Sequence, residues 1–248
     1  MYYIDHYDSP FGGITLASDG SALCGLWFDG QKYFGDTLPP RGAQAEESAG
    51  KRRRGRAAIR RKPDPLQEEE IRRGAVYIFG QTREWLDLYF HGKIPGFTPP
   101  LAMFREQEAA QGVQAVGIAE VQRNSYAQAA GTPGNPDAES DHSDMVSLGD
   151  KQPRFTKITP FRQSVWRVLL TIPYGETMTY GQIAEQLARD SGAEHVSPQA
   201  VGGAIGHNPV SVIVPCHRVL SSTGSLTGYA GGVDTKWKLL ALEGAEIF

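Results

Sequence analysis

A cysteine, a histidine and an arginine follow one another in the run PCHRV at residues 215–219. An unassisted thiol has a pKa of about 8.5, so most of it is protonated at neutral pH, whereas the nucleophile is the thiolate. The neighbouring imidazole of His217 and guanidinium of Arg218 both favour the thiolate of Cys216, and a carboxylate is then needed to orient the imidazole. We expect Glu243, at the end of the last helix, to supply it. From the local sequence alone, an inert buried cysteine remains the alternative.

The rest of the sequence gives little basis for a metal site. Cys24 lies in the apolar run ALCGLWF and is expected to be inert packing. Two cysteines cannot form a disulfide framework or a four-cysteine zinc site, which indicates a reducing, cytosolic setting. His142 stands among acidic residues, but such isolated spacing is more typical of a solvated loop. We therefore expect no metal and no other cofactor.

The elements that must position Cys216 fall in the block 154–248. A helix is predicted to begin at Thr159 and Pro160. Residues 173–175 then form a turn, and Thr179 with Gln182 predicts a capping box for a short helix. The residues of the first helix and the turn after it that we expect to point inward are Phe161, Val165, Trp166, Leu169 and Ile172.

Three more elements complete this block. Ser197 and Pro198 are expected to begin a second short helix, and the β-branched run Val210–Val214 is expected to be a strand that ends at Pro215. Thr235–Leu242 predicts a final helix. This order of elements suggests a winged helix-turn-helix domain.

The second short helix is nearly bare on one side. Each glycine in a helix interior costs about 1 kcal/mol, so its small residues need a reason. One reason is close packing on a neighbouring helix, and the other is close approach to a flat surface such as DNA. The helix has few long polar side chains, so minor-groove contact fits it better than reading of base edges. Its small residues are Ala200, Gly202, Gly203, Ala204 and Gly206.

The N-terminal part alternates between patterned and unpatterned segments. Residues 1–38 predict β-strands, and residues 66–91 predict a helix that Gly80 could divide in two. The segment 41–64 contains KRRRGRAAIRRK, which is either a phosphate-binding or targeting arm or, as its composition favours, a disordered insertion. Residues 105–153 are expected to be a disordered linker.

The composition of the chain excludes several broad classes of protein. The 248 residues include 25 Lys and Arg against 28 Asp and Glu, a net charge of −3, which excludes a uniformly basic coat but not a local basic face. No apolar run approaches the roughly 18 residues of a membrane span, and the N-terminal run MYYIDHYD has no signal-peptide pattern. We expect no membrane association and a cytoplasmic location, or a nuclear one in a eukaryote.

Residues 155–248 resemble the O6-alkylguanine-DNA alkyltransferases almost continuously. The resemblance is weaker over 1–38 and 66–101, and it fails over 41–64 and 105–153. PCHRV is highly specific within this surrounding pattern, whereas PCH alone is weak. The motifs that carry the resemblance are PFRQSVWRVLLTIPYGETMTYGQIA, QAVGGAIGHNP, NPVSVIVPCHRVLSSTGSLTGYAGG and LLALEG.

The resemblance implies an α/β ribonuclease H-like domain at 1–104 and an α-rich winged helix-turn-helix domain at 154–248. It also implies that a monomer binds the minor groove of double-stranded DNA and flips out an alkylated guanine, or an O4-alkylthymine. Cys216 then accepts the alkyl group permanently, so each molecule acts once and needs no cofactor. Extrusion is required because the alkyl carbon lies buried within the duplex.

The same resemblance assigns roles to individual residues. His217 deprotonates Cys216 through a water, Glu243 orients His217, and Asn208 is a hinge before the active-site segment. Tyr180 rotates the flanking phosphate. The remaining substrate- or DNA-binding residues implied are Gln199, Ala200, Gly202, Gly203, Ile205, Arg218, Val219, Tyr229, Ala230 and Lys236.

Two positions depart from the family pattern. Gln199 stands where the best-known members carry an arginine, which acts as a wedge by filling the gap left by the flipped base. The shorter, uncharged glutamine predicts a weaker wedge. Ala230 stands where a serine often donates to O6, so only its backbone N–H is left to donate.

Three alternatives remain open at this stage. A non-catalytic DNA-binding damage sensor would bind lesions without reacting, although such sensors replace the reactive cysteine. A Cys–His hydrolase would turn over repeatedly and need no DNA. An alkyltransferase that also regulates transcription would need an additional DNA-binding module, and none is visible.

Overall fold

The computed structural model describes residues 2–38, 65–105, 146–147, 158–226 and 228–246. The basic segment 41–64 therefore lies outside the described residues, and so does most of the expected linker 105–153 with His142. Within that linker, Val146–Ser147 forms a short strand (β4) that pairs with the N-terminal sheet, so the linker is not structureless throughout.

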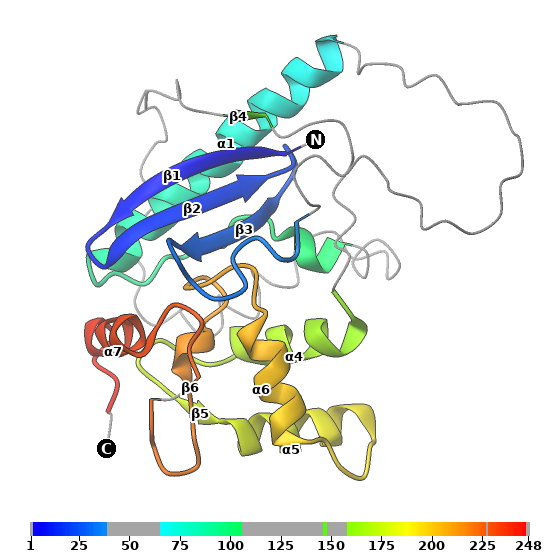
Figure 1. The fold of residues 1–248 in the computed structure, drawn as a ribbon, viewed down its shortest axis with the longest axis vertical. Coiled ribbons are helices and arrows are strands. Elements are labelled where there is room, and N and C mark those ends of the chain that lie inside the picture. Colours follow the sequence, from blue (N-terminus) through cyan, green and yellow to red (C-terminus); the bar gives the residue numbers. More distant parts are fainter. Residues whose placement is uncertain (1, 39–64, 106–145, 148–157, 227, 247–248) are drawn as a thin grey trace, which may run out of the picture.

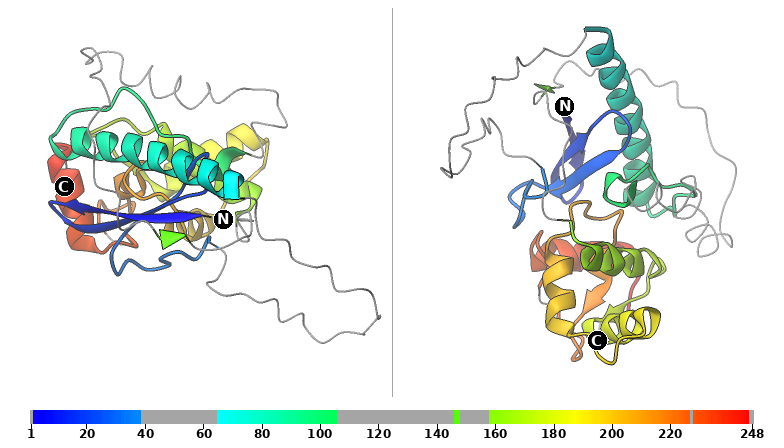
Figure 2. Two further views of the ribbon diagram at one scale, coloured as in Figure 1. Left: turned by 90° about the horizontal axis from the view of Figure 1, so that it is seen from above. Right: turned by 90° about the vertical axis from the view of Figure 1, so that its right-hand side faces the viewer.

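An antiparallel sheet with one long helix across it forms the N-terminal domain (Figure 1). The strands lie in the order β3-β2-β1-β4, and the first three form a meander as the sequence predicted. In the view from above, the helix runs along one face of the sheet (Figure 2). The elements are β1 (Tyr3–Ser9), β2 (Gly12–Ser18), β3 (Leu23–Phe28) and α1 (Pro65–Phe90), followed by the short 3-10 helix η1 (Ala102–Phe104).

Helix α1 is continuous, so the predicted break at Gly80 is wrong. Gly80 is exposed, and an added Cβ would meet nothing within 4 Å, so no tertiary contact forces a bend there. Gly74 has the opposite role, because a Cβ there would lie 2.0 Å from the carbonyl oxygen of Gly20. The glycine thus lets α1 lie directly against the β2–β3 turn. The buried side chains of α1 include Ala75, Ile78, Phe79, Trp85, Leu86 and Tyr89.

The C-terminal domain is mainly helical and carries a two-stranded parallel sheet formed by β5 and β6. Helices α5 and α6 form the helix-turn-helix, and both pack against α4. The elements are α4 (Pro160–Leu170), β5 (Met178–Thr179), α5 (Tyr180–Ser191), α6 (Pro198–Gly206), the 3-10 helix η2 (Cys216–Arg218), β6 (Val219–Leu220) and α7 (Val233–Leu242).

The predicted helix starts are largely confirmed. The Thr159 side chain accepts from the backbone N–H of Arg162, and Thr179 with Gln182 forms a reciprocal capping box. Ser197 occupies the N-cap position of α6, but its side chain makes no capping hydrogen bond. The inward prediction for Phe161 is wrong, because this ring is 38% exposed at the first turn of α4. The other four residues of that prediction are buried.

The segment Val210–Val214 is not a strand, contrary to the prediction. Only Val210 makes a β-bridge, with Leu26 of β3, and Val212 has a positive φ of 69°. The segment is instead a buried turn, with the N–H of Val214 bonded to the carbonyl of Val210. β-Branched residues favour buried positions as well as β-strands. The residues of this segment share burial, so their composition did not establish a strand.

One cluster of buried apolar residues runs through both domains, including Leu26, Phe79, Phe104 and Trp166. Within the described part of the chain, no helix is both long and apolar enough to cross a membrane.

Candidate active site

Cys216 is the first residue of η2 and lies where the two domains meet, with 5% of its surface exposed. The side-chain amide of Asn208 donates to its sulfur across 3.1 Å. The same amide donates to the carbonyl of Val214 at 2.8 Å, and the Asn208 oxygen accepts from the N–H of Val210 at 3.1 Å. Asn208 therefore ties the buried turn together and contacts the thiol, which accords with the hinge position expected of it.

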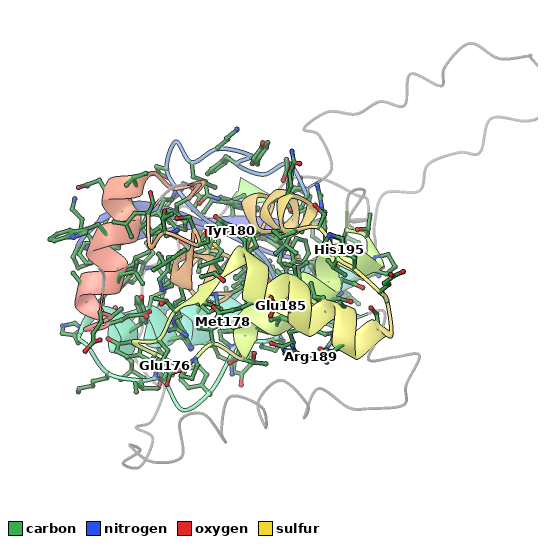
Figure 3. The ribbon with its side chains drawn as sticks, turned by 90° about the horizontal axis from the view of Figure 1, so that it is seen from below. Glu176, Met178, Tyr180, Glu185, Arg189 and His195 are labelled. Atoms are coloured by element: carbon green, nitrogen blue, oxygen red, sulfur yellow. The ribbon has the colours of Figure 1, made fainter. Side chains whose placement is uncertain are left out.

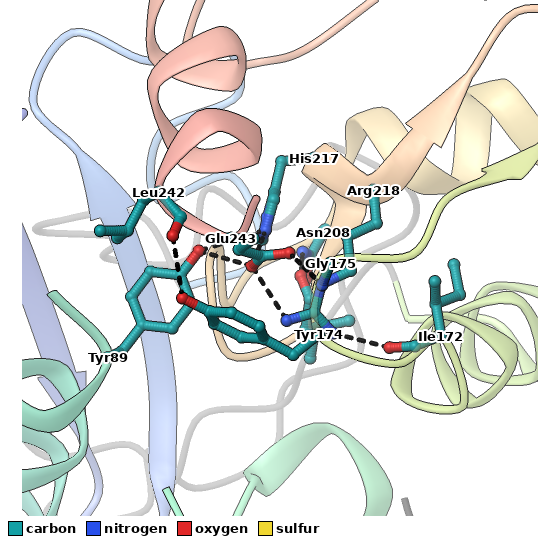
Figure 4. Close-up of polar contacts among 10 residues, drawn as sticks. Tyr89, Ile172, Tyr174, Gly175, Asn208, His217, Arg218, Leu242 and Glu243 are labelled. Atoms are coloured by element: carbon teal, nitrogen blue, oxygen red, sulfur yellow. Dashed lines mark hydrogen bonds and ion pairs between the residues drawn. The ribbon is translucent and has the colours of Figure 1, made fainter. Parts of the chain in front are cut away.

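His217, the residue after the cysteine, forms a buried pair with Glu243 (Figure 4). His217 Nε2 and Glu243 Oε1 lie 2.8 Å apart. When Nε2 carries the proton, Nδ1 presents a lone pair, and among the described residues it has no hydrogen-bond partner although it is buried. Burial, together with the charges of Arg218 and Lys236, lowers the pKa of His217 against the raising effect of Glu243. The imidazole is therefore neutral at pH 7 and able to accept a proton.

Glu243 is held by more partners than His217 alone. Burial raises its pKa, but His217 and Arg218 outweigh burial and hold the pKa well below its ordinary value. Arg218 donates to both carboxylate oxygens, at 2.8 and 2.9 Å. The Tyr89 hydroxyl of α1 donates to Oε1 at 2.7 Å, and the Gly175 N–H donates to Oε2 at 3.3 Å. The carboxylate is thus fixed in one orientation from both domains.

The expectation that Arg218 contacts substrate or DNA is wrong in this structure. The residue is 3% exposed, and its guanidinium is bound to Glu243 and to the carbonyl oxygen of Ile172 at 2.6 Å. A planar fork of donors suits this bidentate contact with a carboxylate. Arg218 therefore balances the buried charge of Glu243.

Cys216 is not poised as a thiolate, which corrects a second expectation. Burial raises the pKa of its thiol above the ordinary value, and the lowering effects of Asn208 and Lys236 do not offset burial. Burial likewise lowers the pKa of Lys236 to about 8, against the effect of Cys216. The Lys236 ammonium donates to the carbonyl of Val219. The thiol is therefore protonated at neutral pH and needs a base to become a nucleophile.

Helix α6 has one packed side and one bare side. Ile205 is buried, and the Trp166 indole donates to the carbonyl of Ala204 at 3.0 Å, so the inner side packs closely on α4. The outer side exposes Gln199, Ala200 and Gly203. The packing explanation of the small residues therefore holds for the inner side, and close approach to a flat surface stays a prediction for the outer side.

Tyr180 lies at the start of α5 beside this helix (Figure 3). An added Cβ at Gly202 of α6 would lie 3.6 Å from the Tyr180 ring, and one at Gly228 would lie 2.9 Å from its hydroxyl. Burial raises the pKa of Tyr180 and Cys216 raises it further, which places the phenol near the thiol.

Tyr229, which Ala230 follows in the chain, packs against the residue next to Cys216. The Tyr229 ring meets the His217 ring edge-on, with centroids 6.5 Å apart. Burial and then Cys216 raise the pKa of Tyr229 well above its ordinary value. The structure thus gathers Tyr180, Tyr229 and Lys236 around the sulfur.

Sequence reasoning missed two contributors from the N-terminal domain. Tyr89 lies in the span 66–91, for which the sequence predicted only a helix, yet its hydroxyl binds Glu243. A buried tyrosine needs a partner for its hydroxyl, and that need was the available signal. Gln31 was not singled out, and it accepts a hydrogen bond from Ser211. Among the residues that the structure describes, no group of three or more His, Cys, Asp or Glu side chains is arranged to hold a metal ion.

Comparison with known proteins matches both domains. Residues 1–103 match the family model described as 6-O-methylguanine DNA methyltransferase, ribonuclease-like domain. Residues 160–245 match the model for the DNA binding domain of the same methyltransferase. The expected fold class, a ribonuclease-like N-terminal domain followed by a helical DNA-binding domain, is confirmed.

Curated relatives match over part of their length. A methylated-DNA–protein-cysteine methyltransferase of Mycobacterium tuberculosis is 55% identical over 85 residues, which are 34% of this chain and 48% of the relative. The protein of that name from Shigella flexneri is 52% identical over 99 residues, 40% of this chain and 55% of the relative. The chain thus aligns with about half the length of the curated relatives it matches.

Solved structures match over nearly the whole chain. The crystal structure of Mycobacterium tuberculosis OGT in complex with DNA is 30% identical with a TM-score of 0.52, covering 98% of this chain and 92% of that one. A crystal structure of a variant of that OGT is also 30% identical, has a TM-score of 0.53 and covers 98% and 93%. The two family models together match most of the chain, one in each domain, and the chain belongs to the O6-methylguanine DNA methyltransferase family.

Proposed function

We propose that this protein repairs DNA by direct reversal, as a methylated-DNA–protein-cysteine S-methyltransferase that moves an alkyl group from O6 of guanine to the sulfur of Cys216. The observation that carries the proposal is the Cys216–Asn208 contact in front of the buried pair of His217 and Glu243. The substrate is double-stranded DNA containing an alkylated guanine or an O4-alkylthymine.

The lesion reaches the thiol when the base leaves the duplex. Extrusion costs a few kcal/mol, so the protein must grip the backbone and fill the vacated space. The bare side of α6 suits a minor groove, and Gln199 at its exposed start is the candidate wedge. Tyr180, at the start of α5 and beside Gly202 of α6, contacts the phosphate next to the lesion.

His217 then activates the thiol. Its Nδ1 lone pair accepts the Cys216 proton through a bridging water, and the Glu243 carboxylate, which Arg218 holds in place, balances the positive charge that develops on the imidazole. A sulfur–carbon bond forms as the bond between carbon and O6 breaks. The proton released by the thiol ends on N1 of the restored guanine. The product is a thioether, which ordinary thiols do not reverse, so each molecule acts once.

The remaining assigned residues line the base. The carbonyls of Cys216 and Val219 accept from the guanine amino group, and Lys236 holds the second of these carbonyls from behind. The backbone N–H of Ala230 donates to O6, while Ile205 and Tyr229 border the alkyl group. The chemistry calls for no metal or organic cofactor. We further propose a monomer that acts on the chromosome in the cytoplasm, since the matched relatives are bacterial.

A titration tests this function. Increasing amounts of duplex with a single O6-methylguanine are incubated with a fixed amount of protein, and repaired guanine is counted. Repair should stop at one equivalent per protein. Continued turnover would indicate a hydrolase, and tight binding without repair would indicate a damage sensor.

A further inference from the structure

The edge of the N-terminal sheet is hydrogen-bonded to the segment that leads to Cys216. The N–H of Leu26 in β3 donates to the carbonyl of Pro209 at 2.8 Å, and the N–H of Ser211 donates to the carbonyl of Leu26 at 2.9 Å. Since these bonds pair β3 with this segment, the backbone of Ser211 is placed by the N-terminal domain.

Gln31 extends this contact to the Ser211 side chain. Its Oε1 accepts from the backbone N–H of Phe28 at 3.0 Å and from the Ser211 hydroxyl at 3.1 Å. Gln31 is 6% exposed and Ser211 is 1% exposed. Phe28 ends β3, so the acceptor that orients the Ser211 hydroxyl is fixed to the sheet.

The next residue along the chain contacts the opposite side of the site. The N–H of Lys32 donates to the carbonyl of Ala230 at 2.9 Å. Ala230 follows Tyr229, whose ring meets His217 edge-on. Residues 31 and 32 therefore hold two segments that lie on either side of Cys216 in the sequence, at Ser211 and Ala230, which are 19 residues apart.

Tyr229 is the next residue to consider, because Ser211 acts on its hydroxyl. The Tyr229 hydroxyl is buried and makes no hydrogen bond of ordinary geometry with any described residue. Ser211 is the polar side chain that counteracts the effects of burial and Cys216 on the pKa of Tyr229. The Ser211 hydroxyl that Gln31 orients therefore acts on Tyr229, whose ring meets the His217 ring.

We propose that Gln31 is a positioning residue for alkyl transfer, which fixes Ser211 against Tyr229 and so sets the width of the space that accepts the alkyl group. The proposal rests on the proposed function of Cys216. It makes the N-terminal domain a determinant of lesion preference, although that domain contributes no group to the chemical step.

The test uses the full chain and two DNA duplexes, one with O6-methylguanine and one with O6-benzylguanine. Gln31→Met keeps the side chain's size but removes the carbonyl acceptor. It should lower the maximal single-turnover rate of methyl transfer about fivefold and leave the half-saturating DNA concentration within about twofold. The benzyl-to-methyl rate ratio should rise at least about threefold, because Gln31 no longer holds Ser211, which can then move outward and admit the larger group.

Two further variants separate positioning from stability. Ser18→Ala removes another buried hydrogen bond of the N-terminal domain, to the carbonyl of Ala22, and should leave the rates and the ratio unchanged. Ser211→Ala removes the proposed contact from its other side and should shift the ratio even if Gln31→Met does not fold. In the Ser211→Ala background, Gln31→Met should add no further effect on the ratio.

The outcomes distinguish this inference from the function beneath it. If the wild type transfers the alkyl group but neither Gln31→Met nor Ser211→Ala changes the benzyl-to-methyl rate ratio, this inference is wrong and the proposed function stands. Equal effects of Ser18→Ala, or additive effects in the double variant, would also overturn it. A wild-type protein that transfers no alkyl group would overturn the proposed function and this inference together.

Discussion

Nε2 of His217 and Oε1 of Glu243 lie 2.8 Å apart, and neither side chain is exposed to solvent. An ionised carboxylate at such depth is stable only with charged or hydrogen-bonding partners on several sides. Arg218, Tyr89 and the Gly175 N–H provide them, so the charge needed to support a protonated imidazole is already in place before any substrate binds.

Glu243→Gln should destabilise the protein by about 3 kcal/mol, because it leaves the Arg218 charge buried without its counter-charge. It should also slow alkyl transfer, since the amide cannot stabilise protonated His217. Urea unfolding and single-turnover rates measure the two effects. The control is Glu69→Gln, which breaks an exposed ion pair on α1 and should change stability by less than about 1 kcal/mol. Equal losses in the two variants would contradict the assigned role of Glu243.

Acid should destabilise the wild type more steeply than Glu243→Gln. The folded state holds the pKa of Glu243 below that of the unfolded chain. The stability it contributes is therefore complete above the unfolded pKa of about 4.3 and is lost as the pH falls toward the folded value. Chemical denaturation between about pH 6 and about pH 3 measures the free energy of unfolding of both proteins. The difference in this free energy between the wild type and Glu243→Gln should narrow as the pH falls. Parallel stability curves would contradict the depressed pKa.

His217→Ala should slow transfer at neutral pH and be partly rescued by raising the pH. Without the base, the rate follows the fraction of thiolate, which rises about tenfold per unit while the pH is below the elevated pKa of Cys216. The wild-type rate should vary far less over the same range, because its neutral imidazole takes the proton. Rates measured from neutral to alkaline pH check this, and a flat profile for the variant would refute the assignment of His217 as base.

Part of the site and of the fold could be predicted from the sequence. The pairing of His217 with Glu243 was predicted from chemical need and is present, as are the capping box at Thr179 and the three N-terminal strands. The thiolate expectation failed because burial of Cys216 outweighs its polar neighbours, and neighbours in sequence do not report desolvation. Arg218 was misassigned for a related reason, since its direction depends on where α7 places Glu243.

The N-terminal contribution could not be predicted for a different reason. Tyr89 reaches Glu243 across 154 positions of sequence, and Gln31 reaches Ser211 across 180. No local pattern encodes such contacts. They arise when β3 and α1 dock on the C-terminal domain.

Asn208→Ala should have two effects. The turn loses bonds to Val214 and Val210, which should lower stability by about 2 kcal/mol. The thiol loses its donor, so the pKa of Cys216 should rise further and its alkylation by iodoacetamide should slow. Thermal unfolding and thiol labelling at fixed pH measure these effects. If the folded variant is labelled by iodoacetamide at the wild-type rate, the Asn208 contact does not affect the Cys216 thiol.

Gln199→Arg should strengthen base extrusion. Gln199 is exposed at the start of α6, where a longer charged side chain could fill the space of the flipped base. The variant should bind lesion-containing duplex more tightly or transfer faster, and Lys238→Arg on α7, an exposed position with the ion-pair partner Asp234, should do neither. If both variants behave like the wild type, the wedge lies elsewhere.

The most direct test of the central claim is the intact mass of the protein after incubation with duplex DNA containing O6-methylguanine. The wild type should gain the mass of one methyl group, and peptide mapping should place it on Cys216. Cys216→Ala should gain none while still binding the same duplex. No gain by the wild type, or a methyl group on any other residue, would contradict the claim that this sulfur is the acceptor.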